Sequence, residues 1–126
     1  FSENELKIYD EFKFIILKSK NIYYVEEELN HLDLYKLYTY FDYYISTHIG
    51  EGLGITLYDN MILKNKIISP LYSGEKDYLN SENCISLDYE EKEIIELKSH
   101  PIYKQIKNYT GAVISDEIIL NCLLQL

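Results

Sequence analysis

The 126-residue chain contains no arginine and no tryptophan, and the lack of arginine limits its possible functions. All twelve of its basic residues are lysines, and 21 acidic residues outnumber them, so the formal net charge is −9. Arginine supplies the bidentate contacts to phosphates and bases, and an acidic surface repels the nucleic-acid backbone. The composition therefore argues against nucleic-acid binding.

Cysteines and long apolar runs are also scarce in this sequence. Cys84 and Cys122 are the two cysteines, and neither stands near another cysteine or histidine at the spacing of a zinc site. We expect both to be reduced core residues, as is typical of a reducing compartment such as the cytoplasm. No apolar run approaches the ~20 residues of a membrane span, and the densest stretch, residues 117–126, includes polar residues. We expect neither a bound metal nor a membrane span in this segment.

Hydrophobic residues make up 47% of the chain and charged residues 26%, which is enough apolar material for a folded core. The length is that of one domain or of part of one. The sequence begins at Phe1 without an initiator methionine. We therefore expect residues 1–126 to form a single, partial domain of a longer protein.

Apolar residues recur at helical spacing in several segments, and short runs of β-branched and aromatic residues form others. Helices are expected over residues 3–19, 30–41 and about 52–63, although residues 13–17 could equally form a buried strand. After a break at residues 100–101, a last helix is expected, capped by Ser115 and with Ile118, Ile119, Cys122 and Leu123 facing inward. Strands are expected over residues 21–25, 42–46, 66–69 and 84–87. Strands that alternate with helices need crossover connections, so the pattern predicts a parallel sheet and the α/β class.

Three of the five glycines, Gly50, Gly52 and Gly54, fall between the strand at 42–46 and the following helix. Backbone amides and the dipole at a helix N-terminus attract anions, and glycine lets a ligand approach the backbone. The spacing GxGxG is neither a Walker loop nor the dinucleotide fingerprint, so it is compatible with a phosphate site or with a plain structural turn. His48, just before the turn, is interpreted as a packing or solvent residue.

Two carboxylates accompany this turn: Glu51 lies within it, and Asp59 follows eight residues later. Eight helical residues rise ~12 Å, about the distance from a transferred sugar across a diphosphate to a ribose. A carboxylate does not favour a nearby phosphate, so we expect these two to accept hydrogen bonds from sugar hydroxyls. The alternative is that Glu51 faces solvent and Asp59 lies on the polar face of the helix.

The stretch DYYISTHIGEGLGITLYDNMILKNKIISPLYSGEKDYL resembles the donor-binding segment of GT-B glycosyltransferases of the family 4 type. Those enzymes typically show a strand ending in serine, then EGFGLPLLEAM, a small strand and a GGxxE-like turn. The resemblance covers about residues 20–90. It places the first glutamate of the family on Glu51, its glycines on Gly52 and Gly54, and its second acidic position on Asp59.

This resemblance implies a Rossmann-like parallel sheet with flanking helices, the C-terminal lobe of a GT-B fold. It also implies transfer of a sugar from a nucleotide-sugar to an acceptor hydroxyl, with retention and without a bound metal or other cofactor. Glu51 would be the catalytic residue that holds a hydroxyl of the transferred sugar, and Asp59 would hold the ribose. The amides of Leu53, Gly54 and Ile55 would bind the diphosphate. The implied donor-binding set is Gly50, Gly52, Leu53, Gly54, Ile55 and Asp59.

Some features depart from the family pattern. Asp59 is one methylene shorter than the usual glutamate, Thr56 replaces a proline, and Asn60 replaces an alanine. The expected partners are the nucleotide-sugar donor, an N-terminal lobe missing from this chain, and an acceptor that can be a glycan, a lipid or a protein. We expect residues 25–28, at the end of the first predicted strand, to set the preference for the base. A second interpretation stays open, a non-catalytic transferase-like or receiver-like α/β interaction module.

Overall fold

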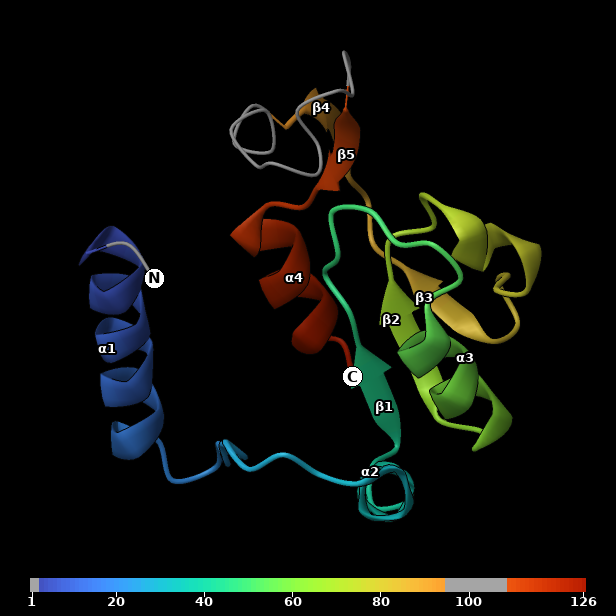
Figure 1. The fold of residues 1–126 in the computed structure, drawn as a ribbon. Coiled ribbons are helices and arrows are strands. Elements are labelled where there is room, and N and C mark those ends of the chain that lie inside the picture. The colour runs from blue at the N-terminus through green and yellow to red at the C-terminus, as the bar shows by residue number, and fades with distance from the viewer. Residues whose placement is uncertain (1–2, 95–108) are drawn as a thin grey trace. The chain divides into compact units, whose positions relative to one another are not determined.

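A computed structural model describes residues 3–94 and 109–126 of the chain (Figure 1). The chain divides into two compact units, Phe1–Asn30 and His31–Leu126. The first unit contains helix α1 (Glu3–Lys18), which agrees with the predicted helix, followed by residues 19–30 without regular secondary structure. The second unit contains the other helices and all the strands described.

The strand predicted over residues 21–25 is wrong, because the segment forms no ladder. Tyr24 instead packs edge-on against Phe12 of α1, with ring centroids 6.0 Å apart, and Tyr23 is 90% exposed. Glu26 accepts hydrogen bonds from Tyr9 and from Lys13 of the same helix. The expectation that residues 25–28 contact a base depended on the missing strand, so it loses its basis.

A parallel sheet forms the centre of the second unit, as the alternation of elements predicted. Its strands are β1 (Tyr43–Ile45), β2 (Lys66–Ser69) and β3 (Cys84–Ser86), in the order β1-β2-β3. Tyr43 is opposite Lys66 in the register, and Ile67 is opposite Cys84. The central strand β2 is the most buried of the three, and its residues Ile67 and Ile68 are almost fully buried, as is typical of a strand covered on both faces.

One α-helix precedes these strands, and a second α-helix and a short 3₁₀ helix connect them. Helix α2 (His31–Tyr38) precedes β1, α3 (Ile55–Ile62) lies between β1 and β2, and the 3₁₀ helix η1 (Gly74–Asp77) lies between β2 and β3. Leu57 of α3 packs with Ile67, Leu79 and Cys84 in the core, where burial raises the pKa of the Cys84 thiol to about 11. Both cysteines are free, Cys84 buried and Cys122 half-buried.

Two buried asparagines link the end of α3 to the end of α2 by hydrogen bonds. Asn60 donates to the carbonyl of Thr56 at 2.8 Å, and its Oδ1 accepts from Asn65 Nδ2 at 2.7 Å. Asn65 Nδ2 also donates to the carbonyl of Tyr38, the last residue of α2, at 2.8 Å. Asn60 therefore has a structural role that an alanine at this position could not supply.

A second, antiparallel pair was not predicted from the sequence. Strands β4 (Glu90–Glu93) and β5 (Thr110–Val113) pair with Glu90 opposite Val113. The predicted break at residues 100–101 lies outside the described residues. The residues of β4 are all charged and all exposed, so no alternation of apolar and polar residues marks them as a strand.

The last helix, α4 (Asp116–Leu123), begins where the sequence predicted. The Ser115 hydroxyl accepts from the amide of Ile118 at 3.4 Å, which confirms the predicted cap. The predicted inward face is only partly correct, because no residue of α4 is buried and Leu123 is 48% exposed. None of the helices in the described ranges has the length and apolar character of a membrane span.

Candidate functional site

The predicted site lies at the carboxyl ends of the parallel strands (Figure 1). The chain leaves β1 at Ile45 and reaches the glycine loop, residues 50–54, directly before α3. The chain leaves β2 at Ser69 and turns through residues 70–73 into η1. In an open parallel sheet, ligands bind in the crevice outside this edge.

Gly54 sets the geometry with which the glycine loop enters α3. Its φ of 68° and ψ of 59° are left-handed, a conformation that residues with a side chain rarely adopt. A Cβ at this position would also lie 2.9 Å from both Leu57 Cδ1 and the Tyr78 hydroxyl. Because this left-handed residue is the N-cap, α3 starts at Ile55 rather than near Gly52, and no side chain caps it.

Three successive carbonyl groups of the glycine loop face η1 and the residue that follows it. The Gly52 carbonyl oxygen lies against Gly74, where an added Cβ would come within 2.0 Å of it. The Tyr78 hydroxyl donates to the carbonyl of Leu53 at 2.6 Å and to that of Gly54 at 3.1 Å. The carbonyls of residues 52, 53 and 54 are thus held on one side of the loop.

The amides of Leu53, Gly54 and Ile55 belong to the same three peptide units. No peptide bond is cis in the described residues, and in a planar trans unit the N–H points opposite to the C=O. These three N–H groups therefore point away from η1, and they have no acceptor within the described part of the chain. Uncapped amides that converge at a helix N-terminus form an anion-binding site.

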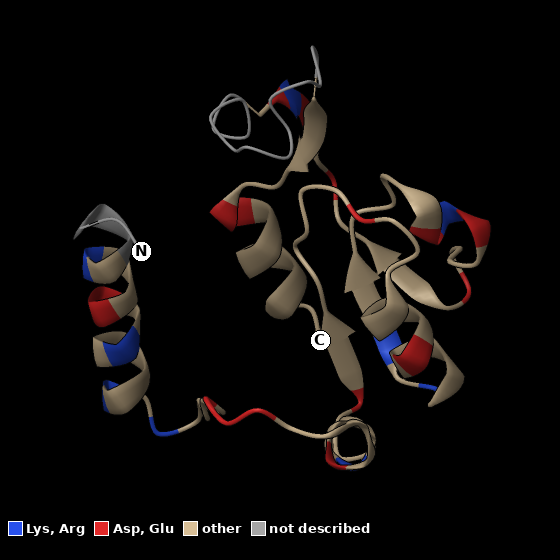
Figure 2. Ribbon diagram, in the orientation of Figure 1, with Lys and Arg blue, Asp and Glu red and all other residues tan. Residues whose placement is uncertain are grey.

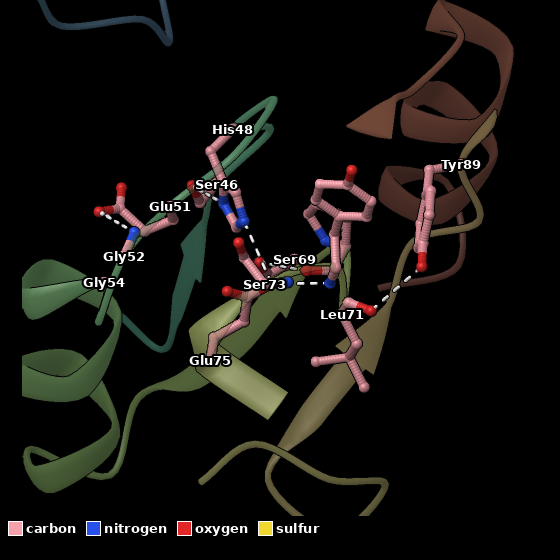
Figure 3. Close-up of polar contacts among 12 residues, drawn as sticks. Ser46, His48, Glu51, Gly52, Gly54, Ser69, Leu71, Ser73, Glu75 and Tyr89 are labelled. Atoms are coloured by element: carbon pink, nitrogen blue, oxygen red, sulfur yellow. Dashed lines mark hydrogen bonds and ion pairs between the residues drawn. The ribbon is translucent and has the colours of Figure 1, made fainter. Parts of the chain in front are cut away.

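The two predicted carboxylates lie in different environments. Glu51 is exposed in the loop, and its Oε1 accepts from the amide of Gly52 at 3.2 Å (Figure 3). Asp59 lies in the second turn of α3, and its Oδ1 accepts from the Tyr35 hydroxyl of α2 at 2.6 Å. This bond raises the pKa of Tyr35. The helical rise estimated between the two carboxylates does not apply, because Glu51 lies outside α3.

The start of the glycine loop lies against β5, an element that the sequence did not predict. The amide of Ala112 donates to the carbonyl of Ile49 at 2.7 Å. A Cβ on Gly50 would lie 2.9 Å from the Tyr109 hydroxyl. The loop is therefore supported from two sides, by β5 at Ile49 and by η1 at Gly52.

A buried carboxylate not predicted from the sequence joins the two loops at this edge of the sheet (Figure 3). Glu75 is fully buried in η1, and its Oε1 accepts from the amides of Tyr72 at 2.7 Å and Ser73 at 2.8 Å. The same oxygen lies 3.3 Å from His48 Nε2, and His48 Nδ1 lies 3.1 Å from the Ser46 hydroxyl. His48 is thus a packing residue, one of the two interpretations made from the sequence.

Burial by itself would raise the pKa of Glu75. The hydrogen bonds from the amides of Ser73, Glu75 and Tyr72, together with nearby His48, outweigh burial and hold the pKa below its ordinary value. Glu75 is therefore ionised at neutral pH. Its Oε2 is buried without a hydrogen-bond partner among the described residues. Such an unpaired oxygen lowers the stability of the fold.

Sequence reasoning missed Glu75 and Tyr78 because both lie in a segment, EKDYL, that reads as a polar connection. The one local signal is Gly74, which allows the turn to pack against the loop. No group of three or more metal-ligating side chains occurs within residues 3–94 and 109–126. The candidate site consists of backbone amides flanked by carboxylates.

Comparison of the chain with protein-family models, curated proteins and solved structures found no match in any of the three. Its function must therefore be inferred from its own residues and their geometry.

Proposed function

We propose that the chain is the donor-binding lobe of a glycosyltransferase, which transfers a sugar from a nucleotide-sugar to an acceptor hydroxyl. The observation that carries this proposal is the set of three uncapped amides, of Leu53, Gly54 and Ile55, at the N-terminus of α3. They lie at the carboxyl edge of a parallel sheet, beside an exposed carboxylate, Glu51. A diphosphate that carries hydroxylated groups at both ends matches this combination of donors and acceptors.

The diphosphate would be bound mainly by neutral hydrogen-bond donors. Residues 46–54 and 67–75 contain no lysine, and the only charged residue in the loop after β1 is Glu51 (Figure 2). As the bond to the transferred sugar breaks, negative charge develops on the leaving diphosphate. Amides that are already oriented would stabilise this charge without reorganising, which is the usual basis of such catalysis. Retention and independence of a metal follow from the family resemblance.

The carboxylates would hold the two ends of the donor. Glu51 is exposed at the start of the amide row and would accept a hydrogen bond from a hydroxyl of the transferred sugar. Asp59 lies one helical turn beyond Ile55 and would hold the ribose through Oδ2, the oxygen that does not accept from Tyr35. The bond from Tyr35 would then fix the orientation of this shorter carboxylate.

One observation favours the second candidate, a non-catalytic α/β interaction module. Asp59 and Glu51 each already accept a hydrogen bond from a group of their own chain, Tyr35 and the Gly52 amide. Carboxylates satisfied in this way are compatible with a site that has lost its ligand.

Amide chemical shifts separate these two candidates. The protein is titrated with UDP-, GDP- and ADP-sugars, and with the corresponding free nucleosides as controls without phosphates. The transferase is supported by shifts confined to residues 50–59, provided that the nucleosides do not shift the amides of residues 53–55. The absence of any shift at millimolar ligand contradicts it and favours the module.

A further inference from the structure

Tyr78 lies directly after η1 and contacts the glycine loop from the side opposite to its free amides. Its hydroxyl donates to the carbonyl of Leu53 at 2.6 Å and to the carbonyl of Gly54 at 3.1 Å. A hydroxyl has a single proton, so this one donor is shared between two carbonyls that are adjacent in the chain.

The two carbonyls depend on Tyr78 to different degrees. The Gly54 carbonyl also accepts from the amide of Tyr58 at 2.9 Å, the first hydrogen bond of α3. The Leu53 carbonyl has no other donor among the described residues. The peptide unit between Leu53 and Gly54, which carries the Gly54 amide, is therefore held mainly by Tyr78.

Tyr78 is itself held firmly in place. Its ring packs edge-on against Tyr58 of α3, with centroids 5.2 Å apart and an interplanar angle of 87°. Its amide donates to the Glu75 carbonyl at 3.2 Å, and its carbonyl accepts from Asn83 Nδ2 at 3.0 Å. Burial and the negative charges of Glu75 and Glu51 raise the pKa of Tyr78 to about 12. The hydroxyl therefore keeps its proton, and its role as donor, throughout the neutral range.

We propose that Tyr78 is a positioning residue for the anion site: its hydroxyl orients the Leu53–Gly54 peptide so that the Gly54 amide faces a bound diphosphate. Tyr78 itself does not touch the diphosphate, because the carbonyls it holds and the amide it orients lie on opposite sides of the peptide unit. The role of the ligand rests on the proposed function, whereas the orientation of the peptide does not.

The test compares Tyr78→Phe with Tyr89→Phe. The Tyr89 hydroxyl also donates to a backbone carbonyl, that of Leu71 at 3.3 Å, but it does not contact the glycine loop. Inorganic pyrophosphate and UDP are the probes, and amide shifts give both the affinity and the place of binding. We expect Tyr78→Phe to weaken both ligands about three- to tenfold, the scale of one hydrogen bond, and Tyr89→Phe to change them less than about twofold.

A general loss of stability is separated from positioning by two further measurements. Urea unfolding shows whether the two variants lose similar stability, and 4-aminophenylalanine at position 78 restores an N–H donor to the same carbonyls. Rescue of affinity by this replacement supports positioning. Wild-type affinity in Tyr78→Phe, or equal weakening in the two phenylalanine variants, overturns it.

The same titrations give a different result if the proposed function is wrong. If neither probe shifts the amides of residues 53–55 in the wild-type protein, the proposed function is contradicted. The ligand-free spectra then decide the structural part of the inference. Tyr78→Phe must shift the Gly54 amide and speed its exchange with solvent, while Tyr89→Phe leaves it unchanged. An unaltered Gly54 amide in Tyr78→Phe overturns the inference.

Discussion

Gly74 and Gly52 lie so close together that a Cβ on Gly74 would be 2.0 Å from the Gly52 carbonyl oxygen. The turn after β2 can therefore approach the glycine loop after β1 this closely only because residue 74 has no side chain. This contact places Glu75 beneath the loop and brings Tyr78 to the carbonyls of Leu53 and Gly54. The orientation of the three free amides follows from it.

The two glycines at this contact are expected to respond differently to alanine. In Gly74→Ala the new methyl group meets backbone that cannot move without displacing the loop, so we expect a loss of about 1–3 kcal/mol in the free energy of unfolding. Gly52→Ala is the matched control, because a Cβ there meets nothing within 4 Å. Urea unfolding of both variants measures the difference. Equal stability of the two variants would contradict so close a contact between Gly74 and the Gly52 carbonyl.

The contribution of Glu75 to the stability of the fold is expected to decrease at acidic pH. Its pKa is lowered in the folded state, so its contribution is complete above the unfolded value of about 4.5 and is lost as the pH falls through the folded value. Glu75→Gln weakens the charge-assisted bonds to the amides of Tyr72 and Ser73, and we expect it to cost about 1–3 kcal/mol at pH 7.

Urea unfolding from pH 7 to pH 3 tests this expectation. The difference in stability between wild type and Glu75→Gln should stay constant down to about pH 4.5 and shrink below it. Glu82→Gln, the same substitution at an exposed position, is the control for general charge effects. A difference that stays constant down to pH 3 would contradict a lowered pKa at Glu75.

Glu51 is expected to matter for the reaction and little for the fold. In the proposed transferase, Glu51→Gln should lower kcat by about 10²-fold or more, the scale of one lost transition-state contact. Among the residues that the structure describes, only the Gly52 amide donates to its exposed side chain, so the unfolding free energy should change by less than about 0.5 kcal/mol. Steady-state kinetics with a nucleotide-sugar donor measures the first effect, with Glu82→Gln as control. Unchanged kinetics would exclude Glu51 from the site.

Several elements could be predicted from the sequence because their signals are local. The two isoleucines within residues 66–69 mark β2, whose bounds agree with the prediction, and the serine before an acidic turn marks the start of α4. The glycine cluster between a strand and a helix predicted a loop that leads into α3, although the helix starts at Ile55 rather than near Gly52. Apolar runs, caps and glycines act within a few residues, so they can be recognised without knowledge of the fold.

Other features were decided by the tertiary structure, because they depend on partners distant in the sequence. Residues 21–25 have strand composition but lack a ladder, whereas the charged residues of β4 form a strand because β5 pairs with them. Glu75 is buried and ionised because its carboxylate lies against the Tyr72 amide, in the turn before it, and against His48. The sequence by itself determined that an uncapped glycine loop opens α3. Which way the amides of that loop point depends on contacts with residues distant in the sequence, Gly74 at the Gly52 carbonyl and the hydroxyl of Tyr78 at the Leu53 carbonyl.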